Sequence, residues 1–187
     1  MFLDIFALVT GLIFMVLQIK QSNWMWPVEI VACTPLIIVF IQGHAWGSAA
    51  LQVYYLVMAF VGLFTWRKAA EKVDEGVVHL SRPGRTTTIV SLLATTAGWI
   101  AVAYFFSRSG DVSPILDAGV LVLGVVGTWW LTRSYLEQWF IWVVADTLQI
   151  VVCIILGKYA MALLYVAYVA SSVIGYIHWK KLGEYVD

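Results

Sequence analysis

Charge is scarce in this sequence. Only 12% of its 187 residues are charged, 62% are hydrophobic, and the 11 basic residues balance the 11 acidic ones. A soluble domain of ordinary composition is about one quarter charged and about half apolar, so these proportions exclude that class. A net charge of zero without a basic tail also excludes a nucleic-acid-binding protein. The composition predicts an integral membrane protein, whose surroundings are the lipid bilayer.

Sequence patterns for catalysis and metal binding are missing as well. Cys33 and Cys153 both lie in apolar runs, which is typical of packing residues and not of a disulfide or a ligand pair. The histidines, at positions 44, 79 and 178, lie in or near connections, and we expect them to be solvated. No Ser/His/Asp or Cys/His arrangement, phosphate-binding loop or zinc spacing is present. We therefore predict no catalytic residue, no metal ion and no cofactor.

Long apolar runs are what the chain has in abundance. Each is close to the roughly 20 residues that a helix needs to cross a hydrocarbon core of about 30 Å. We predict seven transmembrane helices, at about residues 2–19, 24–42, 46–66, 86–107, 114–131, 135–156 and 159–179. The first is expected to be retained, because no small-residue cleavage site follows it. The one long polar connection, residues 67–85, is expected to be a solvated loop.

An internal repeat links the third and seventh runs. The two runs end alike, with Gly62-x-x-x-Trp66-Arg67-Lys68 and Gly175-x-x-x-Trp179-Lys180-Lys181. The separation of Gly62 from Gly175, which we call the repeat offset, is also that of Tyr55 from Tyr168. We also pair Trp24 with Trp139, whose separation in sequence is slightly larger than the repeat offset, and we attribute the difference to inserted loop residues. A chance match is the alternative, which the equal separation of the tyrosines disfavours.

The repeat divides the chain into three parts. Two three-helix units, residues 1–66 and 113–187, flank a segment at 67–112 that holds the polar loop and the fourth helix. Because an odd number of helices separates the units, both would insert with the same orientation, as a 3+1+3 parallel repeat. The predicted fold class is therefore all-α and integral to the membrane.

Basic residues predict the orientation of the chain. The connections after the first, third and fifth runs and the C-terminal end hold nine of the 11 basic residues: Lys20, Arg67, Lys68, Lys72, Arg82, Arg85, Arg133, Lys180 and Lys181. Lysine and arginine accumulate in cytoplasmic connections. We expect the N-terminus outside and the C-terminus in the cytoplasm.

The sixth run carries an acid where the bilayer midplane would be. Trp139, Trp142 and Asp146 lie within about 60° of one another on a helix. A carboxylate at this depth costs roughly 2.5–3.5 kcal/mol, so it should face protein or a water-filled cavity. One interpretation is a buried acid held by a neighbouring hydroxyl, with the tryptophans as packing anchors. We favour a site for a cationic or polar aromatic ligand, which indole faces and a carboxylate would both bind.

Other polar residues are predicted to complete this binding site. Its predicted members are Trp139, Trp142, Asp146, Gln52, Tyr55, Tyr165, Tyr168, Glu137 and Gln138. Two further acids are interpreted differently. We expect Glu29 to snorkel to the cytoplasmic interface and Asp117 to complement a helix N-terminus near the outer boundary.

The sixth run also carries a family resemblance. The motif Trp139-x-x-Trp142-x-x-x-Asp146, followed by Gly157-Lys158-Tyr159-Ala160, resembles the signature helix of the PnuC vitamin transporters. The likeness covers residues 51–66 and 117–181 and is weak at 67–112. It implies a SWEET-like 3+1+3 architecture, a bacterial inner-membrane location and a homotrimer. It also implies facilitated diffusion, with metabolic trapping of the substrate by a cytoplasmic kinase.

The substrate is the most specific expectation. The nicotinamide riboside carriers typically have Asn at the last motif position, whereas Asp146, with Glu137-Gln138-Trp139 before it, resembles the thiamine-type branch called PnuT. Aspartate only accepts hydrogen bonds, which matches the amine of the thiamine aminopyrimidine. Thiamine is therefore favoured. The alternatives are nicotinamide riboside, riboflavin or a nucleoside and, from another class, a membrane-embedded enzyme or accessory subunit with a second essential acid near Asp146.

Overall fold

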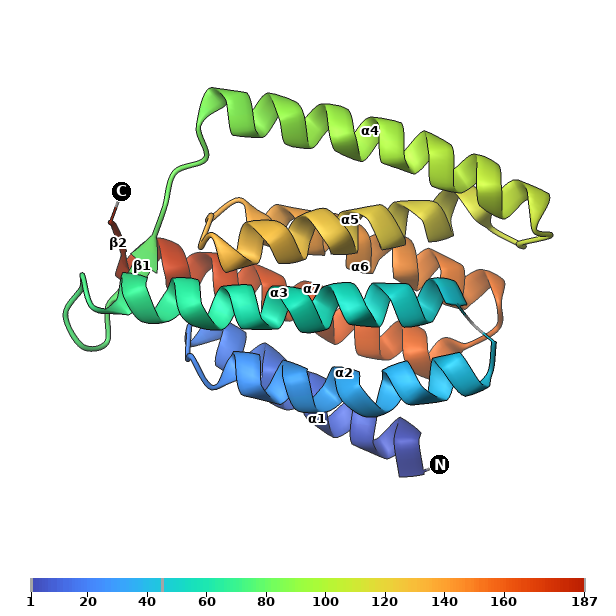
Figure 1. Ribbon diagram of the computed structural model, residues 1–187, viewed down its shortest axis with the longest axis horizontal. Coiled ribbons are helices and arrows are strands. Elements are labelled where there is room, and N and C mark those ends of the chain that lie inside the picture. The colour runs from blue at the N-terminus through green and yellow to red at the C-terminus, as the bar shows by residue number, and fades with distance from the viewer. Residues whose placement is uncertain (1, 45, 187) are drawn as a thin grey trace.

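Seven helices and two short strands form an elongated bundle in the computed structural model, which describes residues 2–44 and 46–186 (Figure 1). The helices are α1 (Phe2–Ile19), α2 (Met25–Gln42), α3 (Trp46–Ala70), α4 (Arg85–Arg108), α5 (Pro114–Thr132), α6 (Gln138–Ile155) and α7 (Tyr159–Leu182). The strands are β1 (Val78–Leu80) and β2 (Gly183–Tyr185). All helices run roughly along the long axis of the bundle.

Length and hydropathy make six of the described helices, α2 to α7, candidates to cross a membrane, and the described apolar part of α1 covers Val9–Ile19. The prediction of an all-helical membrane protein is confirmed. Two predicted ends are too early, because α3 continues to Ala70 and α7 to Leu182. An apolar run marks the hydrocarbon core, whereas helical hydrogen bonding continues through basic residues into water.

Helix packing separates α4 from the other helices. The pairs α1–α2, α2–α3, α5–α6 and α6–α7 pack together, and contacts of α1 with α7 and of α3 with α5 join the two sets. Within the described chain, α4 packs against α5 alone, and Figure 1 shows it along one side of the bundle. Its outward side chains, such as Leu92 and Phe105, are apolar and exposed, as lipid-facing residues are.

Four buried tryptophans form a layer across the bundle, which we call the tryptophan layer: Trp26, Trp66, Trp139 and Trp179. Their rings meet edge to face in the order Trp26–Trp66–Trp179–Trp139, with centroid separations of 5.0, 5.9 and 5.3 Å. Such edge-to-face pairs contribute about 0.5–1.5 kcal/mol each beyond burial. The layer therefore joins α2 and α3 to α6 and α7.

Hydrogen bonds from the two central indoles follow the repeat. Trp66 Nε1 donates to the Leu131 carbonyl at 3.1 Å, and Trp179 Nε1 donates to the Gln18 carbonyl at 3.2 Å. The two donors are related by the repeat offset, and so are the two acceptors. Each half of the chain thus donates its indole N–H to the other half.

The pairing of Trp24 with Trp139 is wrong. Trp24 is 72% exposed. Trp26 instead covers Gly62, and Trp139 covers Gly175 in the same way, so closely that an added Cβ on either glycine would overlap the indole. Trp26 and Trp139 are related by the same repeat offset as the glycines, so no inserted loop residues shift the second helix relative to the sixth.

The polar connection after α3 is not the solvated loop that we expected. Its strand β1 pairs in parallel with β2, and Ser81 forms an isolated bridge to Tyr135. We call residues 78–81 and 183–186 the strand cap. It lies at the end of the bundle where α3 and α7 finish (Figure 1). A three-residue strand is too short to produce a hydrophobic period, which is why the sequence pattern did not reveal it.

His79 is buried in the strand cap, with 3% of its surface exposed, so the prediction that it is solvated is wrong. The side chain of Gln21 makes two hydrogen bonds of 2.8 Å with the backbone of His79: Nε2 donates to the carbonyl, and Oε1 accepts from the N–H. Nδ1 of His79 lies 3.0 Å from Ser134 Oγ, and the imidazole meets the Trp66 ring edge to face, with the ring centroids 5.5 Å apart. Burial lowers the pKa of His79 to about 4, because an imidazolium would lose its hydration there. The strand cap therefore packs directly on the tryptophan layer.

Candidate binding cavity

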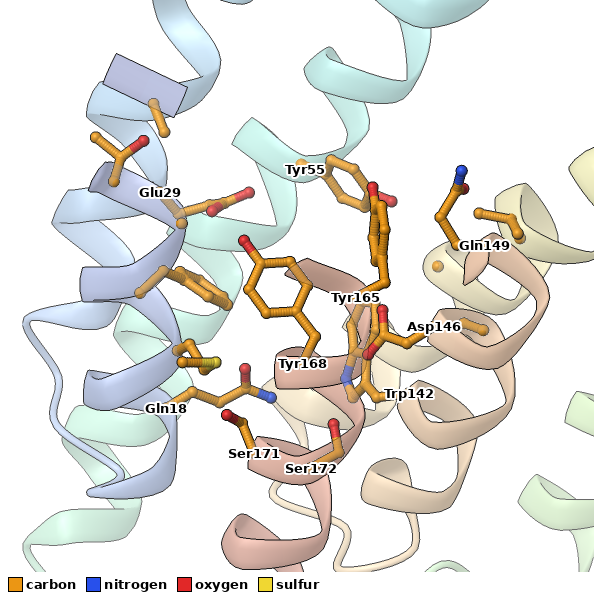
Figure 2. Close-up of a pocket in the computed structure, with 18 of the residues that line it drawn as sticks. Gln18, Glu29, Tyr55, Trp142, Asp146, Gln149, Tyr165, Tyr168, Ser171 and Ser172 are labelled. Carbon is orange, nitrogen blue, oxygen red and sulfur yellow. The ribbon is translucent and has the colours of Figure 1, made fainter. Parts of the chain in front are cut away.

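A cavity of about 430 Å³ lies among the helices (Figure 2). Its lining residues are Thr10, Gly11, Phe14, Met15, Gln18, Glu29, Ala32, Cys33, Leu36, Gln52, Tyr55, Val120, Gly124, Trp139, Trp142, Ala145, Asp146, Gln149, Tyr165, Tyr168, Ser171 and Ser172. Every helix except α4 contributes to this described lining. The volume falls in the range of about 300–1,000 Å³ that is common for small-molecule sites.

Seven of the nine residues predicted for the binding site line this one cavity. They are Trp139, Trp142, Asp146, Gln52, Tyr55, Tyr165 and Tyr168. Glu137 instead directly precedes α6, makes no capping hydrogen bond with its side chain, and is exposed. Gln138 is fully buried and accepts a hydrogen bond of 3.5 Å from Gln18, which itself lines the cavity. These two residues lie outside the cavity wall, although Trp139, which follows them directly, is part of it.

Glu29 is an acid of the cavity, so its interpretation as a snorkelling group is wrong. Figure 2 shows its carboxylate pointing inward from α2, toward Tyr55 and Tyr168. The thiol of Cys33, one turn along the same helix, donates to Glu29 Oε1 at 3.4 Å. The repeat could have revealed this position, because the repeat offset pairs Glu29 with Trp142.

Asp117, the other acid that we interpreted as structural, is outside the cavity. It lies in the first turn of α5 and accepts a hydrogen bond from the hydroxyl of Ser113, the residue that precedes the helix. A carboxylate at a helix N-terminus complements the helix dipole. This position agrees with the role that we predicted for it.

The two cavity acids face each other across aromatic side chains. Figure 2 shows Glu29 on the α1–α2 side and Asp146 on the α6 side, with Tyr168 and Tyr165 between them. The two tyrosine rings meet edge to face, with centroids 5.6 Å apart. Lysine, arginine and histidine do not occur among the described lining residues, so no basic side chain there neutralises either acid.

The two indoles that α6 contributes to the cavity, Trp139 and Trp142, both have a buried Nε1 donor without a hydrogen-bond partner in the described chain. Buried donors are nearly always paired, with protein, water or a ligand. Trp142 is part of the cavity wall, and its unpaired donor lies on the same residue, one turn from the acceptor oxygens of Asp146.

This geometry serves binding rather than bond-breaking. It combines carboxylates, phenol and indole rings and amide groups in a largely apolar pocket, which suits a small ring compound that carries positive charge. No group of three or more possible metal ligands occurs in the part of the chain that the structure describes. A ligand cavity among membrane-crossing helices is the arrangement that a membrane transporter requires.

Comparison with known proteins identifies the family. The family model described as nicotinamide mononucleotide transporter matches residues 1–181, so the chain belongs to this family, that of the PnuC transporters. It is a multi-pass transporter of the vitamin type and not an enzyme, which removes the membrane-enzyme alternative. Members are expected in the bacterial inner membrane.

Its relatives include proteins with different ligands. The riboflavin/roseoflavin transporter RibM of Streptomyces davaonensis is 28% identical over 178 residues, which cover 94% of this chain and 83% of the relative. The nicotinamide riboside transporter PnuC of Neisseria mucosa is 28% identical over 137 residues, 68% of this chain and about half (52%) of the relative. A crystal structure of the vitamin B3 transporter PnuC superposes with a TM-score of 0.74 at 24% identity, covering 97% and 81% of the two chains, which establishes the shared fold.

Proposed function

We propose that this transporter carries an unphosphorylated cationic vitamin, with thiamine as the favoured substrate. The observation that carries the proposal is the pair of acids, Glu29 and Asp146, in a cavity whose described lining has no basic residue. Buried carboxylates need a compensating charge or strong donors, and a cationic ligand supplies both.

The same pair of acids disfavours a phosphorylated ligand. A nucleotide phosphate would enter a cavity with two carboxylates, and like charges brought together in a partly desolvated site repel each other by several kcal/mol. Protein sites for phosphate normally present arginine, lysine or backbone N–H groups instead. We therefore expect the free vitamin, and not its phosphate ester, to bind.

Thiamine fits the polar groups of the cavity better than the vitamins that the relatives carry. Its thiazolium is a cation, and its aminopyrimidine presents an amine to an acceptor such as Asp146. Nicotinamide riboside is the second candidate, because its pyridinium ring would also bind between aromatic faces and a carboxylate. Riboflavin, which the Streptomyces relative carries, has no positive charge for these acids to bind.

We also propose how the chain moves its substrate. Facilitated diffusion of unmodified vitamin, a 3+1+3 parallel repeat, a cytoplasmic C-terminus and a homotrimer remain predictions. The repeat is supported by the contacts and hydrogen bonds that recur at the repeat offset. The orientation is supported by the nine basic residues on one side, several of which lie in or beside the strand cap.

The test is a ligand panel with the purified protein. Trp139 and Trp142 line the cavity, so bound ligand should change the tryptophan fluorescence. We expect saturable quenching by thiamine, weaker quenching by nicotinamide riboside, and at least about tenfold weaker binding of thiamine monophosphate. A protein that binds the monophosphate or a neutral vitamin as tightly as thiamine would refute the proposal. The variant Trp24→Phe, changed at an exposed tryptophan, is the control for unspecific quenching.

A further inference from the structure

The two acids of the cavity are not equivalent positions of the repeat. The repeat offset, which relates Trp26 to Trp139, also pairs Glu29 with Trp142 and Cys33 with Asp146. The helix α2 therefore has its acid where α6 has an indole. Glu29 is four residues before Cys33, the repeat partner of Asp146, and four residues correspond to about 6 Å along a helix. The two acids therefore lie one helical turn apart in depth.

The surroundings of the two acids differ in chemistry. On the α6 side, Asp146 is accompanied by Trp142 Nε1, a buried donor without a described partner, and by the amide of Gln149. This edge both accepts and donates hydrogen bonds. On the α2 side, the thiol of Cys33, a weak donor, is the described hydrogen-bond partner of Glu29. Figure 2 shows the rings of Tyr55 and Tyr168 near Glu29.

These differences match two different parts of a ligand. An aminopyrimidine presents an amine donor beside a ring-nitrogen acceptor, which is the complement of the mixed edge at Asp146 and Trp142. A thiazolium has positive charge and no N–H donor of its own. It needs a carboxylate and aromatic faces rather than a hydrogen-bonding edge, and Glu29 with the two tyrosines offers these.

We propose that Glu29 is a second ligand-binding acid, which binds the cationic ring of the substrate beside Tyr55 and Tyr168 while Asp146 accepts a hydrogen bond from the amine of the other ring. The inference rests on the proposed function and adds an orientation to it. It assigns charge recognition to α2 and amine recognition to α6. Glu29 is then a specificity-determining residue of the transporter.

The experiment compares two variants with three ligands. The ligands are thiamine, its neutral 3-deaza analogue, which keeps the amine, and oxythiamine, which keeps the charge but has a carbonyl in place of the amine. We expect Glu29→Gln to weaken thiamine binding by about 10- to 100-fold and to reduce the preference for thiamine over the deaza analogue. The preference for thiamine over oxythiamine should stay unchanged in this variant. Asp146→Asn should show the reverse pattern.

Two control variants make the outcomes distinct. Glu137→Gln removes an exposed acid outside the cavity and should leave both preferences unchanged. Glu29→Asp keeps the charge, so it should retain the preference for the charged ligand. The inference is overturned if the wild type binds thiamine and Glu29→Gln keeps the full wild-type preference for thiamine over the deaza analogue. Where Glu29→Gln does not fold, loss of that preference in Glu29→Asp overturns it. If the wild type does not bind thiamine, the proposed function itself fails.

Discussion

The tryptophan layer and the binding cavity differ in whether residues related by the repeat offset are identical. In the layer, residues related by the repeat offset are identical: Trp26 and Trp139, Trp66 and Trp179, Gly62 and Gly175. In the cavity, Tyr55 and Tyr168 are identical, but other polar residues have a different partner: Glu29 and Trp142, Cys33 and Asp146, Gln52 and Tyr165. Packing between two similar halves requires the same shape on both sides, whereas an asymmetric ligand requires different groups. The tryptophan layer is thus symmetric, whereas the acids of the cavity are not.

Removing the charge of Asp146 should have the largest effect on ligand binding. Asp146→Asn keeps the shape and adds a donor, so we expect a loss of about 2–4 kcal/mol of thiamine binding energy, because a buried charge-assisted contact is broken. Nicotinamide riboside binding should rise, since the variant has the amide of the riboside branch. Titration of both ligands against wild type and variant measures this. Unchanged thiamine affinity would make Asp146 a structural residue.

Substitutions in the symmetric layer should lower stability equally in both halves. Gly62→Ala and Gly175→Ala each force an indole to move, and we expect each to cost about 1–3 kcal/mol. Thermal unfolding in detergent provides the measurement, with Gly47→Ala as a control, because a Cβ at Gly47 meets no described atom within 4 Å. A loss at only one of the two glycines would contradict the equivalence of the halves.

Tryptophans inside and outside the cavity should differ in their contribution to binding. Trp142→Ala should weaken thiamine binding by about 1–2 kcal/mol, because a stacked or cation-binding ring is lost. Trp24→Ala, at a position 72% exposed, should leave the affinity unchanged. Calorimetric titration measures the thiamine affinity of both variants without depending on tryptophan fluorescence, which the substitutions themselves change. Equal losses would make both residues general membrane anchors.

The smallest expected effect concerns the strand cap. Because burial lowers the pKa of His79 from 6.5 to about 4, the unfolded segment binds a proton more readily than the folded one. The contribution to stability is therefore present above pH 6.5 and is lost as the pH falls toward 4. Between pH 7 and 5.5 we expect a loss of about 1 kcal/mol.

Hydrogen exchange of residues 78–80 can follow this change. In the wild type, the protection factor of these amides, which corrects the exchange rate for the intrinsic effect of pH, should fall on acidification. His79→Gln cannot titrate, so its protection should stay constant over the same interval. Constant protection in both proteins would mean that His79 is not held in its neutral form.

Sequence reasoning was strongest where one helix carries the signal. The apolar runs of the seven helices and the stripe of Trp139, Trp142 and Asp146 are visible within single segments, since each depends only on helical periodicity. Glu29 needed knowledge of which helices surround α2, and a single helix cannot supply this. The same limit hid the burial of His79, which results from contacts with Gln21 and Ser134 that are far away in the chain.

The most direct test of a transporter for an unphosphorylated cation is uptake of labelled thiamine into proteoliposomes without an ion gradient. The account predicts that thiamine enters until its inside and outside concentrations are equal, that nicotinamide riboside competes, and that thiamine monophosphate does not. Empty liposomes and the Asp146→Asn variant are the controls. Competition by the monophosphate as strong as that by thiamine, or no uptake of thiamine at all, would contradict it.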